Sequence, residues 1–103
     1  MGAELFETRQ SASTADEAFR LLVEQARYLH GNRGYTGTIA EKAGFRMEPP
    51  RDGETPTDCV TRCLDDEAHW SGTTWGPAAC VDGGPDPKQP GLRIYYFFGW
   101  ASA

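Results

Sequence analysis

The segment Leu92–Trp100 constrains the fold more than any other part of the chain, because apolar and aromatic residues fill most of its positions. Successive side chains of an extended strand point to opposite faces of the sheet. Tyr95 and Phe97 would therefore lie on one face, and the alternate residues from Leu92 to Trp100 would lie on the other. This pattern predicts a strand that needs cover on both faces.

A first helix is marked by its capping residues. Thr14 with Glu17 three residues later makes a capping box, and the apolar positions that follow recur at steps of three and four residues. Gly31 comes directly after the last of these positions, where a left-handed C-cap favours glycine. The sequence therefore predicts a helix over residues 15–30.

The later elements follow from capping and turn signals. Thr55 as a cap, with Pro56 at the first helical position, predicts a second helix to about residue 67. Runs of β-branched and aromatic residues separated by turn residues predict strands. These strands cover residues 35–41, 45–47, 75–81 and 92–100.

This order of elements, α-β-β-α-β-β, predicts an α+β fold in which a four-stranded antiparallel sheet carries two helices on one face. A chain of 103 residues leaves room for one hydrophobic core. We therefore expect a single domain over residues 15–103, preceded by an arm over residues 1–14 that could be flexible.

Charge and hydropathy argue against two classes of partner. Fifteen acidic and ten basic residues give a net charge of −5, which repels phosphate backbones and disfavours general nucleic-acid binding. No apolar run approaches the roughly 18 residues that a membrane span needs, and the first residues lack a signal-peptide pattern. We expect a cytoplasmic protein that makes no membrane contact, and its three cysteines are expected to be reduced thiols.

Three cysteines and one histidine offer a possible metal site. Cys59 and Cys63 lie four residues apart on one helical face, and His69 and Cys80 follow them. These four side chains could close a tetrahedral zinc site, although the spacing lacks the ligand pairs typical of structural zinc. The simpler interpretation is that Cys59 and Cys63 are small buried hydrophobes. We therefore expect no cofactor and no catalytic cysteine.

The glycine-bearing segment 31–38 is a possible ligand site. Its backbone N–H groups and hydroxyls could cradle an anion, and the candidate binding residues are Arg33, Tyr35, Thr36 and Thr38. Phosphate loops, however, precede a helix and use its positive end, whereas this segment follows one. The alternative is that these glycines serve the helix cap and a turn.

Two helices cover only one side of a four-stranded sheet, so one face would remain open. We expect Tyr95, Phe97 and Trp75 to line that face as a contact surface for a second copy or for a host protein. The alternative is that the N-terminal segment or the loop dense in Gly and Pro, residues 82–91, folds over it.

The string 34–42, GYTGTIAEK, together with residues 75–78 and the closing segment 97–102, FFGWAS, resembles a family of small uncharacterised proteins encoded by bacteriophages of actinobacteria. The resemblance spans residues 15–103, and the glycine-tyrosine-threonine motif is its most specific part. It implies a non-virion product in the host cytoplasm, among genes that modify host processes or counter host defence. It implies no known activity, so no site residue follows from it.

The chain lacks a strong catalytic signature and carries an aromatic strand on which a partner could dock. The sequence therefore predicts a non-enzymatic interaction module, acting as a homodimer or on a host protein. Two alternatives stay open: a binder of nucleotides or other small molecules that uses residues 31–38, and a zinc-stabilised module.

Overall fold

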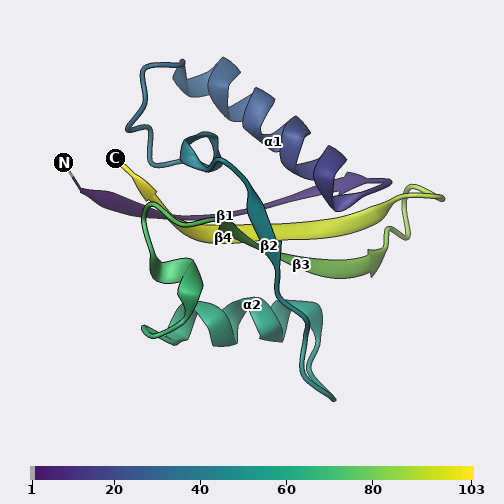
Figure 1. Ribbon diagram of the computed structural model, residues 1–103. Helices are drawn as coiled ribbons and strands as arrows, with labels where there is room; N and C mark the ends of the chain where they lie inside the picture. Colours follow the sequence, from purple (N-terminus) through teal and green to yellow (C-terminus); the bar gives the residue numbers. More distant parts are fainter. Residues whose placement is uncertain (1) are drawn as a thin grey trace.

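The computed structural model describes residues 2–103 and contains two helices and one four-stranded sheet (Figure 1). The predicted α+β class is therefore confirmed. In chain order the elements are β1 (Ala3–Ala12), α1 (Ala15–His30), the short 3-10 helix η1 (Ile39–Glu41), β2 (Phe45–Met47), α2 (Pro56–Asp65), a second 3-10 helix η2 (Trp70–Gly72), β3 (Ala78–Pro85) and β4 (Arg93–Ser102).

The sheet is mixed, so the expectation of a purely antiparallel sheet is wrong. Its strand order is β1-β4-β3-β2. β4 pairs antiparallel with both of its neighbours, whereas β2 runs parallel to β3. The reason is the helix α2 between β2 and β3, because a strand-helix-strand connection returns the chain to the same end of the sheet.

The two helices pack on opposite faces of the sheet, so the expectation that they share one face is wrong as well (Figure 1). α1 covers the face that carries Phe6 and Phe97, and α2 covers the face that carries Val81 and Phe98. The connection from β1 to β2 crosses the sheet in one direction, and the connection from β2 to β3 crosses back. Two such crossovers of the same hand place their helices on opposite faces, in keeping with the strong preference for one hand.

Local capping explains where the helices begin and end. The backbone N–H of Glu17 donates to Thr14 Oγ1 at 3.1 Å, and α1 ends at His30, followed by the C-cap Gly31 with a φ of 83°. α2 begins with the capping box formed by Thr55 and Asp58, and it ends at Asp65, two residues earlier than expected. The first helix has the predicted bounds because both of its caps are set by neighbouring residues.

Two segments in the first half of the chain differ from their expected structures. The expected arm contains β1, whose ten residues pair with β4 along their whole length. The expected strand at residues 35–41 is a loop followed by η1, because Tyr35 has a φ of 54° and Gly37 a φ of 70°, values that an extended strand excludes. Thr38 then caps η1 by accepting from the backbone N–H of Ala40.

β4 lies between β1 and β3 and supplies the core on both sides of the sheet. Phe97, on the α1 side, packs with Phe19 and Phe45 at ring-centroid distances of 5.8 and 5.4 Å. Phe98, on the α2 side, packs with Cys59, Val60 and Cys63. In residues 2–103, no helix combines the length and the apolar character that crossing a membrane requires.

Candidate functional site

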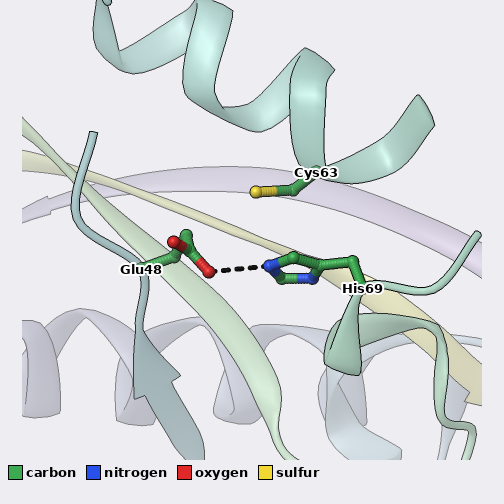
Figure 2. Close-up of side chains that lie close together, drawn as sticks. All are labelled: Glu48, Cys63 and His69. Carbon is green, nitrogen blue, oxygen red and sulfur yellow. Dashed lines mark hydrogen bonds and ion pairs between the residues drawn. The ribbon is translucent and has the colours of Figure 1, made fainter. Parts of the chain in front are cut away.

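Three metal-ligating side chains from separate segments converge between α2 and the sheet. Glu48 directly follows β2, Cys63 lies in the last turns of α2, and His69 precedes η2. Their ligand atoms all lie within 4.8 Å of one another, and Figure 2 shows the three side chains pointing toward a common centre. We call this group the Glu48–Cys63–His69 cluster.

Hydrogen bonds fix the histidine and the carboxylate of the cluster. His69 Nε2 lies 2.7 Å from Glu48 Oε1, and the indole N–H of Trp70 donates to the same oxygen at 3.2 Å. The other ring nitrogen, Nδ1, accepts from the backbone N–H of Ser71 at 3.1 Å and lies 2.7 Å from the Ser71 hydroxyl. With Nδ1 as an acceptor, a neutral His69 carries its proton on Nε2 and donates it to Glu48.

The cluster is largely removed from solvent. The side chains of His69 and Glu48 are 8% and 17% exposed, and Cys63 is buried. Burial, together with the neighbouring Cys59 and Glu48, raises the pKa of the Cys63 thiol to about 12. A protonated, buried thiol is a poor nucleophile, and both ring nitrogens of His69 are already engaged by Glu48 and Ser71, so this arrangement does not favour nucleophilic catalysis by Cys63.

The predicted set of metal ligands is only partly brought together. Cys63 and His69 belong to the cluster, whereas Cys80 lies on the α1 side of the sheet, buried with Phe97. Cys59 lies one helical turn before Cys63 and contacts Arg62, whose guanidinium lies 3.6 Å from its sulfur. The four-residue site proposed from sequence is therefore wrong, because β3 directs Cys80 away from the other three residues.

Glu48 is the residue that sequence reasoning missed. It lies just beyond the predicted strand at residues 45–47, and nothing in its neighbours signals a ligand. Its position depends on the pairing of β2 with β3, since the Glu48 backbone N–H donates to the Cys80 carbonyl at 2.8 Å. Only this long-range pairing brings the carboxylate to His69.

The segment predicted to bind an anion surrounds a carboxylate instead. The Thr36 hydroxyl and backbone N–H both donate to Glu41 Oε2, at 2.7 and 3.2 Å, and the Thr36 and Thr38 hydroxyls lie 2.8 Å apart. Burial opposes ionisation of Glu41, but the hydrogen bonds from Thr36 and the charge of Arg27 outweigh it and lower its pKa. The Thr36 hydroxyl is thus engaged with a negative charge, and the Thr38 hydroxyl is engaged with Thr36.

A polar hollow of about 350 Å³ lies beside this carboxylate. It is lined by Arg27, Gly31, Asn32, Gly34, Ala40 and Glu41. Two of the predicted ligand residues, Arg33 and Tyr35, are exposed and do not line it, and Tyr35 is 53% exposed. The presence of ionised Glu41 in the wall argues against a phosphate at this position.

The predicted aromatic contact surface does not exist on the sheet. Tyr95 and Phe97 are buried beneath α1, at 6% and 0% exposure, because the helices cover both faces. Trp75 is 75% exposed, but it lies in the segment between η2 and β3, outside the strands. The proposed use of Tyr95 and Phe97 as an interface is therefore wrong.

The structure instead leaves the outer edge of β1 open. β1 is an edge strand of ten residues. Gly2 and Ala103 exchange two backbone hydrogen bonds, at 3.1 and 3.0 Å, so the even-numbered residues of β1 pair with β4. The odd-numbered residues turn their N–H and C=O groups toward the open side. A strand edge of this kind can add a further strand.

An apolar groove runs beside this edge, between β1 and α1. It encloses about 210 Å³ and is lined by Phe6, Thr8, Leu22, Gln25, Ala26, Leu29, His30, Thr38 and Ile39. Leu29 is 65% exposed and the adjacent Tyr28 is 88% exposed. The groove and the edge together offer backbone hydrogen bonds and apolar area at one surface.

Comparison of the chain with protein-family models, curated proteins and solved structures finds no match. On geometry, two places on the molecule are candidate sites: the Glu48–Cys63–His69 cluster and the open edge of β1.

Proposed function

We propose that this protein is a non-enzymatic interaction module that binds through the open edge of β1, and that its partner there is a second copy of the chain. The observation that carries the proposal is the ten-residue edge strand whose alternate backbone groups face outward beside an apolar groove. Extended partners bind such edges through main-chain hydrogen bonds.

The backbone geometry restricts how two β1 strands can pair. In an antiparallel pair of identical edges, outward-facing odd residues must lie opposite odd residues. The two-fold axis therefore passes midway between the two copies of one β1 residue. An axis at residue 7 would place Glu7 opposite Glu7, and an axis at residue 9 would place Arg9 opposite Arg9. An axis at Thr8 places Glu7 opposite Arg9 twice, and this is the register that charge favours.

Other contacts agree with the axis at Thr8. Glu7 and Arg9 are both exposed, and neither forms an ion pair within residues 2–103. The pairing would keep α1 of both copies on the same side of an extended sheet, with the two grooves beside the shared edge. Exposed Leu29 would thereby be buried.

Charge reversal tests this register. Glu7→Arg and Arg9→Glu each place like charges opposite one another twice, and each should weaken the dimer about 10- to 100-fold, because two cross-strand pairs of about 0.2–1 kcal/mol change sign. The double variant restores opposite charges and should recover the wild-type affinity. Light scattering after size exclusion, over a concentration series, measures the dissociation constant of the dimer for each variant. A monomeric wild type, or a dimer unaffected by both single changes, would reject the proposal.

The resemblance to small actinobacteriophage proteins supports a wider context for this proposal. A non-enzymatic accessory protein that acts on host processes or host defence needs a binding surface, and the open edge of β1 would supply one. We extend the proposal to that role. Deletion of the gene from its phage, followed by growth on the native host, would test it.

A further inference from the structure

We infer that the Glu48–Cys63–His69 cluster is a zinc site. The three residues supply a carboxylate oxygen, a thiolate sulfur and an imidazole nitrogen, which are the three ligand types that zinc takes in proteins. A thiolate and an imidazole in one site disfavour magnesium and calcium, which prefer oxygen ligands throughout. The proposal concerns a site separate from the β1 edge and does not depend on it.

The existing distances are close to those of a metal centre. Zinc bonds of about 2.0–2.3 Å in a tetrahedron separate the donor atoms by about 3.4–3.6 Å. The donors of the cluster lie within 4.8 Å of one another, and His69 Nε2 and Glu48 Oε1 lie 2.7 Å apart. Zinc would therefore replace one short hydrogen bond and draw the sulfur closer, through side-chain adjustments of about an ångström.

The surroundings orient the ligands as outer residues of metal sites do. Once Nε2 binds the metal, the imidazole proton moves to Nδ1, which then donates to the Ser71 hydroxyl 2.7 Å away and gives up the hydrogen bond that it accepts from the Ser71 backbone N–H. The Trp70 indole donates to Glu48, and the Trp70 ring itself lies under the Arg46 guanidinium at 5.0 Å. Both the imidazole and the carboxylate are thus held in place from outside the cluster.

Charge balance favours a divalent ion in this buried position. Zinc binding converts the Cys63 thiol to a thiolate and releases its proton to solvent, while Glu48 contributes a second negative charge. Two anionic ligands and a neutral imidazole offset the charge of Zn²⁺, so the loaded site carries no net charge. A hollow whose wall includes Cys63 and Ser71 lies beside the cluster, and a water that entered through it would complete a tetrahedral zinc site.

Cobalt is the probe for this site, because a cobalt–thiolate bond gives a charge-transfer absorption band that oxygen and nitrogen ligands do not. Titration of the reduced, metal-free protein with Co²⁺ should give this band with one equivalent bound, and Zn²⁺ should remove it by displacement. Cys63→Ser should abolish the band and weaken Zn²⁺ binding by about 100-fold or more. Glu48→Gln and His69→Gln should each weaken binding while the thiolate band remains at saturating metal.

The two other cysteines are matched controls. Cys59→Ser lies one turn away on the same helix, and Cys80→Ser lies on the other side of the sheet, so both should keep the band. Circular dichroism verifies that each variant is folded. No thiolate band in the wild type, an unchanged band in Cys63→Ser, or loss of the band in folded Cys80→Ser would overturn the inference.

Discussion

The Nε2 atom of His69 lies 2.7 Å from Oε1 of Glu48, and this contact joins the segment after β2 to the segment after α2. Both segments lie outside the helices and strands, and hydrogen bonds between their side chains hold them together. The same carboxylate also accepts from Trp70. The pair therefore has a structural role in the metal-free protein, whatever it binds.

Glu48→Ala should lower the free energy of unfolding of the metal-free protein by about 2–4 kcal/mol, because it leaves the N–H groups of His69 and Trp70 without their acceptor. Glu48→Gln should cost less, since its amide oxygen still accepts. Urea denaturation with a chelator present measures both. Glu67→Ala, at an exposed position, is the control and should change the value by less than about 0.5 kcal/mol. Equal effects at positions 48 and 67 would contradict this role.

Lys42 is a buried lysine that binds three carbonyl groups. The residue is 5% exposed, and Nζ donates to the carbonyls of Thr73, Thr74 and Gly76 at 3.2, 2.9 and 3.0 Å. Lys42→Met nearly keeps the length of the side chain and removes these charge-assisted bonds. The free energy of unfolding should therefore fall by about 2–4 kcal/mol.

The exposed Lys88 provides the comparison for this change. Lys88→Met removes the same charge from the surface and should alter the free energy of unfolding by less than about 0.5 kcal/mol. Both variants can be followed by thermal and urea denaturation. A Lys42→Met protein as stable as Lys88→Met would mean that the hydrogen bonds from Lys42 Nζ to the three carbonyls do not stabilise the fold.

The helices could be predicted from the sequence, because their determinants are local. Thr14 and Gly31 set the ends of α1 through contacts within one helical turn, and Thr55 with Asp58 does the same at the start of α2. The strand pairing could not be predicted in this way. β2 has three residues, and its partner β3 begins more than thirty residues later, so no local pattern specifies a parallel pair.

The candidate site was half predictable for the same reason. Cys63 and His69 were recognisable by residue type, whereas Glu48 became a ligand candidate only through the pairing of β2. Cys80 was misplaced because residue spacing does not tell which face of a strand is used. The aromatic residues of β4 were correctly identified as needing cover on both faces, but the second helix supplies that cover.

Gly83 allows β3 to approach β4 closely. A Cβ at this position would lie 2.5 Å from Tyr96 Cε2 and 3.0 Å from the Ile94 carbonyl oxygen. Gly83→Ala should therefore lower the free energy of unfolding by about 1–3 kcal/mol, the usual effect of overpacking. Gly44→Ala is the matched control, since a Cβ there meets open space at a φ that alanine accepts. Equal stability of the two variants would show that Tyr96 moves aside without cost.

The ion pair between Glu54 and Arg62 should make stability depend on acid pH. Arg62 Nε and Nη2 donate to the two carboxylate oxygens at 2.7 and 3.0 Å, and this bond, with the Arg51 backbone N–H, lowers the pKa of Glu54 to about 2. The unfolded value is 4.5, so folding favours the ionised form. The stabilisation is present above about pH 4.5 and is lost as the pH falls toward 2.

Glu54→Gln should therefore be less stable than the wild type at neutral pH, and the difference should shrink as the pH falls from 4.5 to 2. Arg62→Gln removes the same bond and should show the same trend, and the double variant should differ from the wild type by no more than either single variant does at each pH. Urea denaturation at a series of pH values measures all four proteins. A difference between wild type and Glu54→Gln that stays constant down to pH 2 would show that Arg62 does not hold the carboxylate in its ionised form.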